Sequence, residues 1–233
     1  MLATLPGVSR TQVVTLIIDG LVTVDGQVVT KPGAIVSTAA SIECDFKASK
    51  YVSRAGLKLE RALLTFKIIV ANKVALDAGL STGGFTDCLL QHGITKVYGI
   101  DVGTNQVHAK IKNDARVVVM EQTNLRHLVS LPEQVDIITL DLSFISVLKV
   151  IVAAAKFLKT DGALIVLIKP QFEVGKKFVG NGGIVKEAQI RERAVKTVVA
   201  GVVAAGFIFK DVIDSPIMGG DGNQEFLAYF TKA

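Results

Sequence analysis

The stretch "LDAGLSTGGFTDCLL", residues 76–90, leads from an apolar run through a glycine-rich turn into a helical pattern. Gly79 allows a tight turn out of the strand. Gly83 and Gly84 allow the backbone to approach a ligand where the helix begins, and the free N–H groups there suit a carboxylate or another anion. The stretch therefore predicts a strand, a turn and a helix, with a ligand site at the turn.

The order of residues in this turn indicates the kind of ligand. A dinucleotide-binding turn would have the pattern Gly-x-Gly-x-x-Gly. Here Asp77 opens the pattern Asp-x-Gly-x-x-x-Gly-Gly, and an acid before the glycines suits a ligand with an amino acid's ammonium and carboxylate better than a pyrophosphate. A glycine-rich turn alone is weak evidence, so a simple loop remains an alternative.

Further apolar runs alternate with helical segments along the rest of the chain. They lie at residues 73–79, 96–103, 116–123, 135–143, 162–170, 207–213 and 225–232. Such alternation predicts an α/β fold with a Rossmann-like, doubly wound and mainly parallel sheet, and the last two runs indicate a closing hairpin. Strands buried on both faces are continuously apolar, which accounts for the mean hydropathy of +0.47.

An ionisable residue stands where each of the first five runs stops: Asp77, Asp101, Glu121, Asp141 and Lys169. Ligands of open α/β sheets bind beyond the carboxyl ends of the strands, so these side chains are expected to meet at one rim. Each could instead be the first solvated residue after a strand. Asp101 is suitably placed to accept ribose hydroxyls, as in folds that bind NAD or S-adenosylmethionine.

The amino-terminal region has a different residue pattern from the rest of the chain. A helical pattern at residues 9–20 is followed by short alternating strands, with Asp25 and Gly26 as a hairpin signal. These features predict a small α+β module over residues 1–46. A polar linker at 47–51 and a larger domain at 52–233 complete the predicted organisation.

Composition narrows the class of protein. The net charge of +5 and the pI near 9.2 favour polyanionic partners only weakly. The longest apolar run, residues 197–209, is shorter than the roughly 18 residues of a membrane-spanning helix. Cys44 and Cys88 have no paired spacing, which argues against a disulfide scaffold and indicates a reducing compartment.

The histidines bear on metal binding, and the amino terminus bears on cellular location. His92, His108 and His127 lack metal-like spacing, so no metal site is expected. No secretory signal is visible, which predicts a cytoplasmic protein. An organellar location remains an alternative if an upstream segment is missing.

Several long motifs resemble one family. The stretches "SRAGLKL", "DLSFIS", "LIKPQFEVG", "GGIVKE" and "GNQEFL", together with the glycine-rich turn, are similar to those of the TlyA-type 2′-O-methyltransferases of ribosomal RNA. These are relatives of the FtsJ RNA methyltransferases and are often labelled hemolysins. The resemblance implies an S-adenosylmethionine-dependent FtsJ-like domain after an α-L RNA-binding domain, here without its first helix. Leu80 departs from the family, which more often has a small residue there.

The resemblance also implies site residues. The family's catalytic Lys-Asp-Lys-Glu set falls on Lys58, Asp141, Lys169 and Glu225. The expected cofactor residues are Asp77, Gly79, Ser81, Gly83, Gly84, Phe85, Asp101, Val102, Glu121 and Asn124. For Phe85 a core position is the more common alternative, and for Glu121 and Asn124 a solvated strand end is an equal one.

RNA is expected to contact both regions of the chain. The predicted residues are Ser9, Arg10, Lys31, Arg54, Lys176 and Lys177. The last two lie in a segment rich in glycine and lysine, residues 173–187, which indicates a mobile loop that clamps RNA phosphates. A plain solvated loop is the alternative.

The chemistry of 2′-O-methylation accounts for the catalytic residue types. A ribose hydroxyl is a poor nucleophile until its proton is removed, whereas the sulfonium methyl is already activated. Lys169 is expected to be the base, which requires it to be partly uncharged, and burial beside the cation Lys58 favours that form. Asp141 and Glu225 oppose this effect. Asp141 is expected to orient Lys169 and the hydroxyl, and Lys58 and Glu225 to set geometry and charge balance.

Three other functions stay open from the sequence. One is a non-catalytic protein that binds RNA or assists ribosome assembly, and another is a membrane-active hemolysin, which the lack of a spanning or strongly basic amphipathic segment disfavours. The third is a base-directed methyltransferase, disfavoured because "DLSF" at 141–144 replaces an Asn-Pro-Pro-aromatic motif. The expected partner is ribosomal RNA or a ribosomal subunit. The nucleotide, the subunit and the oligomeric state are not predicted.

Overall fold

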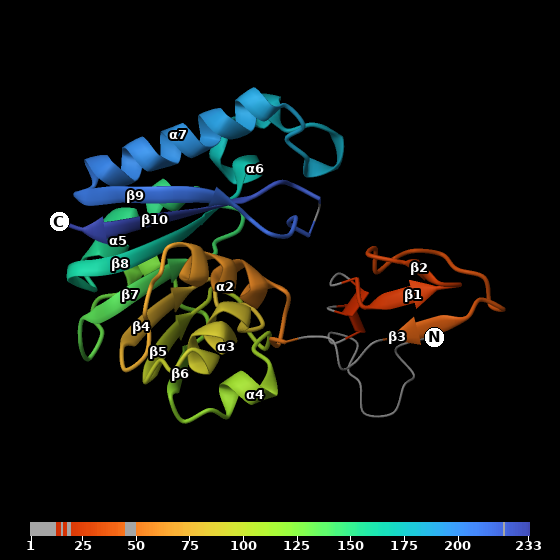
Figure 1. Ribbon diagram of the computed structural model, residues 1–233, viewed down its shortest axis with the longest axis horizontal. Helices are drawn as coiled ribbons and strands as arrows, with labels where there is room; N and C mark the ends of the chain where they lie inside the picture. Colours follow the sequence, from red (N-terminus) through yellow and green to blue (C-terminus); the bar gives the residue numbers. More distant parts are fainter. Residues whose placement is uncertain (1–12, 15, 18–19, 45–49, 221) are drawn as a thin grey trace.

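The computed structural model describes residues 13–14, 16–17, 20–44, 50–220 and 222–233. The described residues form a three-stranded sheet and a seven-stranded sheet. Figure 1 shows the smaller sheet in red and orange as a unit distinct from the larger α/β domain. Most of the predicted linker lies outside the described residues, and so do Ser9 and Arg10.

The small sheet has the order β2-β1-β3. Its strands are β1 (Val22–Val24), β2 (Gln27–Val28) and β3 (Ile42–Cys44), and β1 pairs antiparallel with both neighbours. Asp25 and Gly26 join β1 to β2 with φ of 49° and 77°. Positive φ at both central residues suits a tight hairpin turn, so the predicted hairpin is confirmed.

The large sheet confirms the predicted doubly wound topology, with the order β6-β5-β4-β7-β8-β10-β9. Its parallel strands are β4 (Val74–Ala78), β5 (Lys96–Ile100), β6 (Val117–Met120), β7 (Val135–Leu140) and β8 (Leu158–Ile168). The chain builds β4 to β6 in one direction and β7 to β8 in the other. The topological switch point, where ligands bind in such sheets, therefore lies between β4 and β7.

The last two strands, β9 (Phe207–Asp214) and β10 (Phe226–Lys232), form the predicted closing hairpin. β10 is not the edge strand, because it inserts antiparallel between β8 and β9. Its first residue, Phe226, pairs with Ile168, the last residue of β8. Residues just before β10 are therefore brought to the rim where the parallel strands end.

Helices cover both faces of the large sheet (Figure 1). Helices α2 (Ala55–Thr65) and α3 (Gly84–Gln91) pack on one face, and α5 (Ile151–Ala155) and α7 (Ala188–Ala204) on the other. Neighbouring strand residues alternate between the two cores, as Ala75 and Leu76 do. This double coverage explains why the strands are continuously apolar.

Shorter helices connect the strands at the rims. They are α4 (Ala109–Lys112), α6 (Pro170–Glu173), η2 (Leu125–His127), η3 (Val147–Lys149), η4 (Lys176–Phe178) and η5 (Asn181–Gly183). Among the described residues, no helix combines the length and the apolar character needed to traverse a bilayer.

Candidate active site

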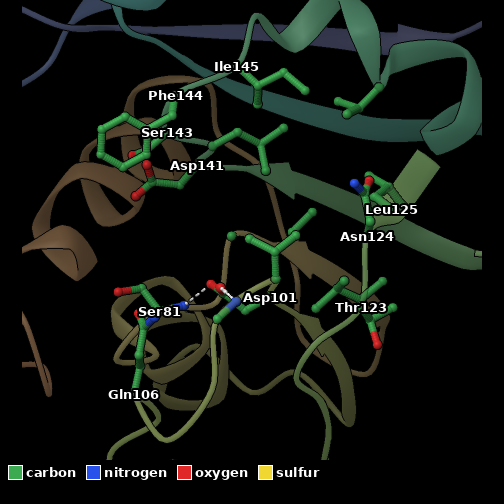
Figure 2. Close-up of a pocket in the computed structure, with 17 residues that line it drawn as sticks. Ser81, Asp101, Gln106, Thr123, Asn124, Leu125, Asp141, Ser143, Phe144 and Ile145 are labelled. Atoms are coloured by element: carbon green, nitrogen blue, oxygen red, sulfur yellow. Dashed lines mark hydrogen bonds between the residues drawn. The ribbon is translucent and has the colours of Figure 1, made fainter. Parts of the chain in front are cut away.

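A cavity of about 360 Å³ lies at the carboxyl ends of β4, β5 and β7 (Figure 2). Small-molecule sites usually measure about 300–1,000 Å³. The cavity is at the switch point of the sheet, where the topology predicts a ligand. Its wall combines apolar residues such as Ile100 and Leu125 with the polar groups of Asp101, Thr123 and Asn124.

Gly79 shapes the floor of this cavity. Its φ is +89°, and a Cβ there would lie 2.2 Å from the carbonyl oxygen of Asp141. The Gly79 amide donates to the Ile100 carbonyl at 2.9 Å, and the Asp141 amide donates to the Ala78 carbonyl at 3.0 Å. The three strand ends thus approach so closely that only glycine fits, and the turn leaves its backbone open to the cavity.

Asp101 links two turns at the cavity wall. Its Oδ2 accepts from the Ser81 amide at 2.7 Å and its Oδ1 accepts from the Gly103 amide at 2.7 Å (Figure 2). Each carboxylate oxygen has two lone pairs, so Asp101 keeps acceptor capacity for hydroxyl groups of a ligand. Its orientation is set by the two backbone bonds before any ligand binds.

Five of the ten residues predicted for the cofactor line the cavity: Gly79, Ser81, Asp101, Val102 and Asn124. The others lie outside its wall. Phe85 is buried in the core between α3 and the sheet, which was the alternative interpretation. A Cβ at Gly83 would collide with Ile111 at 2.8 Å and one at Gly84 with the Ser53 hydroxyl at 2.3 Å, so these glycines serve helix packing. Glu121 does not line the cavity, and its carboxylate accepts from the Gln106 amide at 3.3 Å.

Asp77 lies inside β4 and not at its end. Its side chain is 1 % exposed and accepts hydrogen bonds from the hydroxyls of Thr86 and Thr139, both at 2.7 Å. Strand alternation turns Asp77 toward α3, while the next residue, Ala78, lines the cavity. Burial raises the pKa of Asp77 to about 6. The expected direct contact of Asp77 with a ligand is therefore replaced by a buried contact between strand and helix.

Part of the cavity wall consists of residues that the sequence did not indicate. Gln106 and Thr123 follow the ends of β5 and β6, and the segment 142–145 follows the end of β7. Their position after strand ends is the signal that could have identified them. Residue type offered no signal, since leucine, isoleucine and phenylalanine in this segment resemble core residues.

Asp141 and Lys169 meet at the edge of the same cavity. The Lys169 ammonium lies 2.6 Å from Asp141 Oδ1 and donates to the Ser143 hydroxyl at 2.8 Å. Both side chains are mostly buried, with 11 % of Lys169 and 15 % of Asp141 exposed. Asp141 follows β7 and Lys169 follows β8, so parallel pairing of these strands brings the two together.

Lys58 and Glu225 form a second ion pair, of 2.5 Å between Lys58 Nζ and Glu225 Oε2. Their side chains are 8 % and 3 % exposed. Glu225 immediately precedes β10, and the pairing of Phe226 with Ile168 leaves Glu225 and Lys169 as the next residues of the two strands. Each lysine is therefore ion-paired with a carboxylate. The two carboxylates expected to oppose the effect of Lys58 on Lys169 are therefore each in direct contact with one of the lysines.

The residues predicted to bind RNA lie on several elements. Lys31 is exposed in the small unit, and Arg54 precedes α2. Lys176 and Lys177 are exposed in η4. Lys177 Nζ lies 5.0 Å and the Arg193 guanidinium 5.7 Å from the centre of the Phe178 ring, so cations from η4 and α7 share one aromatic side chain.

The described residues contain no group of three or more His, Cys, Asp or Glu side chains suited to hold a metal ion. His92 and His108 both form local hydrogen bonds: His92 Nδ1 lies 2.8 Å from the Cys88 carbonyl, and His108 Nδ1 accepts from the Lys110 amide at 3.1 Å. These contacts are those of helix-terminal residues.

The sheet order, the glycine turn and the acid at the end of the second strand fit an S-adenosylmethionine-dependent methyltransferase, the class that the family match shows. The chain belongs to the FtsJ-like methyltransferase family, whose model matches residues 51–232. A model of the S4 domain matches residues 1–42. The chain thus combines a methyltransferase domain with an amino-terminal domain of a second family.

Similar proteins carry two kinds of name. The 16S/23S rRNA (cytidine-2′-O)-methyltransferase TlyA of Mycobacterium tuberculosis is 42 % identical over 225 residues, covering 95 % of this chain and 84 % of that protein. Hemolysin A of Brachyspira hyodysenteriae is 41 % identical over 225 residues, covering 95 % of this chain and 93 % of its own. A solved structure described as a hemolysin, from Streptococcus thermophilus, superposes with a TM-score of 0.81 at 39 % identity, covering 97 % of this chain and 88 % of its own.

Proposed function

We propose that this protein transfers a methyl group from S-adenosylmethionine to a ribose 2′-hydroxyl of ribosomal RNA. The relative from Mycobacterium tuberculosis, named for this activity and similar over 95 % of the chain, supports the proposal. The observation that carries it is the Lys169–Asp141 pair, because Asp141 belongs both to this pair and to the cavity wall. A base placed at the mouth of a cofactor pocket is what methylation of a hydroxyl requires.

The cavity fits the cofactor. The open backbone at Gly79 suits the amino-acid portion, Asp101 retains acceptors for ribose hydroxyls, and Asn124 and Leu125 offer a polar edge and an apolar face for adenine. When bound, the cofactor supplies an electrophilic methyl group on a sulfonium centre. The role of the protein is then to orient the hydroxyl and remove its proton.

Lys169 is the proposed base. As an uncharged amine it would take the proton of the 2′-hydroxyl, and the methyl group that the bound cofactor supplies would pass to the hydroxyl oxygen as its bond to sulfur breaks and S-adenosylhomocysteine leaves. Asp141 at 2.6 Å holds the amine in place and stabilises the ammonium that forms. The Ser143 hydroxyl, 2.8 Å from Lys169 Nζ, restricts the direction of the amine further. Proton release to solvent from the 11 % exposed side chain restores the base.

The Lys58–Glu225 pair has a structural part in this proposal. It joins α2 to the start of β10, so it keeps the β10 end aligned with Lys169 on β8. Because the pair is internally neutral, it adds no net charge beside the base. Lys58 and Glu225 are thus proposed to hold the geometry of the rim.

Phe144 is proposed to contact the target nucleotide. It follows Asp141 by three positions, lines the cavity and is 92 % exposed, with a φ of +65°. A non-glycine residue in the left-handed region is strained, and exposing a phenylalanine ring to water costs free energy. Contact with a substrate accounts for both the strain and the exposure. Nucleobases taken out of a helical stack commonly pack on aromatic side chains.

RNA recognition is proposed to use both domains. The S4 family match, the exposed Lys176, and the cations Lys177 and Arg193 beside Phe178 support phosphate contacts on two surfaces. A cytoplasmic location stays a prediction. Lytic activity stays an alternative that the name of the Brachyspira relative raises.

The deciding experiment uses methyl-labelled S-adenosylmethionine with ribosomal subunits and with free ribosomal RNA. Label is expected in RNA, and digestion to nucleosides is expected to give a 2′-O-methylated product. Label on a base would refute the ribose assignment, and RNA binding without label would favour the non-catalytic alternative. Lysis of red cells by the same preparation without cofactor would support the hemolysin alternative.

A further inference from the structure

We infer that Glu173 is a positioning residue, whose carboxylate fixes the segment 142–147 relative to Lys169 and so sets the direction of Phe144. The inference rests on the proposed function and adds a residue to its machinery. Glu173 ends α6, the short helix that begins directly after Lys169. The position of α6 is therefore tied to the position of the proposed base.

The carboxylate of Glu173 reaches across from the β8 side to the β7 side of the rim. Its Oε2 accepts from the Ser146 hydroxyl at 2.6 Å, and its Oε1 accepts from the Val147 amide at 2.9 Å. Ser146 also caps η3, because its hydroxyl accepts from the Leu148 amide at 3.3 Å. Glu173, which follows Lys169 in the chain, thus holds the end of the segment 142–147, which follows Asp141.

The segment 142–147 is held at three points. At its start, the Asp141 amide is bonded to the Ala78 carbonyl. In its middle, the Phe144 ring packs against the Phe172 ring of α6, with centroids 5.3 Å apart. At its end, Glu173 bonds to Ser146 and Val147. Two of these three points belong to α6.

The strained backbone of Phe144 needs such support. A φ of +65° in a residue with a side chain persists only where the surroundings hold it. The ring is 92 % exposed, so its contact with Phe172 covers only a small part of its surface. Hydrogen bonds to a carboxylate are stronger than those to a neutral acceptor, so Glu173 suits this task.

The Glu173 carboxylate is partly buried, which costs free energy unless it is hydrogen-bonded. Burial raises the pKa of its carboxyl group, even though both hydrogen bonds act in the opposite direction. A partly buried acid is retained at such a position when its bonds are needed. Loss of these bonds is expected to shift Phe144 and the wall residue Ile145, and small misplacements at a reacting centre lower rates by up to about 100-fold.

The test compares Glu173→Ala, Glu173→Gln and Ser146→Ala with Glu133→Ala, which removes an acid at the opposite end of the sheet. Glu173→Ala is expected to lower kcat about 10- to 100-fold. Glu173→Gln keeps an acceptor for the Val147 amide and is expected to recover much of this loss. Glu133→Ala is expected to turn over like the wild type. In the Glu173 and Ser146 variants, cofactor affinity, measured by calorimetry, is expected to change less than kcat.

A double variant tests the path through Phe144. If Glu173 acts by placing this ring, Glu173→Ala combined with Phe144→Ala will be no slower than Phe144→Ala alone. If the loss of kcat in the double variant equals the product of the losses in the two single variants, the inference is overturned. Wild-type turnover by both Glu173→Ala and Ser146→Ala would also overturn it.

Hydrogen exchange separates this inference from the proposed function, since it needs no turnover. In Glu173→Ala, the peptide covering residues 141–148 is expected to exchange faster, while peptides from β4 and β7 keep wild-type rates. Unchanged exchange at 141–148 would overturn the inference, as would equally faster exchange throughout the domain. Absence of methyl transfer by the wild-type protein would refute the proposed function and leave the exchange result interpretable.

Discussion

Lys169 Nζ lies 2.6 Å from Asp141 Oδ1, at a point where two parallel strands end side by side. Asp141 also forms part of the cavity wall, so one carboxylate is shared by the proposed base and the proposed cofactor site. In the proposed function, this relationship couples proton removal to the place where the methyl group is held.

Lys169→Ala is expected to abolish methyl transfer, with a loss of at least about 100-fold, because general base catalysis contributes on that order or more. Cofactor affinity is expected to stay within a few-fold of the wild type, since Lys169 does not line the cavity. Single-turnover assays and calorimetry measure the two effects. The control is Lys159→Ala, at the other end of β8, where the side chain is 48 % exposed and pairs with Asp136. Turnover by Lys169→Ala would exclude this lysine as the base.

Lys58→Met is expected to destabilise the protein by about 3–5 kcal/mol, because it leaves the buried carboxylate of Glu225 without a counter-charge. The double variant Lys58→Met with Glu225→Leu is expected to recover most of that stability, since no buried charge remains. Urea unfolding gives the free energies of unfolding. Methyl transfer by the double variant is expected to remain low. A double variant as unstable as Lys58→Met would contradict the view that charge, and not packing, dominates at this pair.

Asp77 is expected to make stability depend on pH. Its pKa is about 6 in the folded protein and about 3.9 when unfolded, so the folded state binds the proton more tightly. The contribution of protonated Asp77 to the free energy of unfolding is fully present below about pH 4 and is lost as the pH rises to about 6. It stays absent at higher pH. The loss amounts to roughly 3 kcal/mol.

The measurement for Asp77 compares urea unfolding of the wild type and Asp77→Asn between pH 4 and pH 8. Asparagine can still bond to the hydroxyls of Thr86 and Thr139 but does not ionise. Relative to the wild type, Asp77→Asn is therefore expected to gain stability as the pH rises from 4 to 6. Parallel pH curves for the two proteins would refute the raised pKa.

Gly79→Ala is expected to weaken cofactor binding at least about tenfold, since its Cβ would come within 2.2 Å of the Asp141 carbonyl oxygen and displace the strand end. Gly206→Ala is the matched control. Gly206 has a similar φ of +93° but no atom within 4 Å of a built Cβ. Calorimetric titration with S-adenosylmethionine measures both. Equal losses of cofactor affinity in the two variants would mean that backbone strain alone causes the effect.

Phe144→Ala is expected to raise the KM for RNA and lower kcat, with a combined loss of about 1–3 kcal/mol, the usual contribution of one base stacked on an aromatic ring. Stability is expected to change little because the ring is 92 % exposed. Ile69→Ala, which removes an exposed side chain elsewhere on the domain, serves as the control. Wild-type kcat/KM for the Phe144 variant would argue against stacking.

The sequence alone was sufficient for the features that depend on local conformation and burial. Continuous apolar runs predict strands buried on both faces, and the observed sheet has helices on both sides. Asp25 and Gly26 predict a hairpin because they tolerate positive φ. The residues at strand ends also predict a common rim, since parallel strands end together.

Tertiary structure alone decided which of these residues face the cavity and which charges meet. Lys58 and Glu225 are 167 positions apart, and only the insertion of β10 beside β8 brings Glu225 to the rim. Asp77 and Asp101 look alike in sequence, yet strand alternation buries the first and leaves the second at the wall. The physical reason is that side-chain direction follows from strand register and from the helices that cover each face. These arise from contacts between distant segments, which local sequence patterns do not encode.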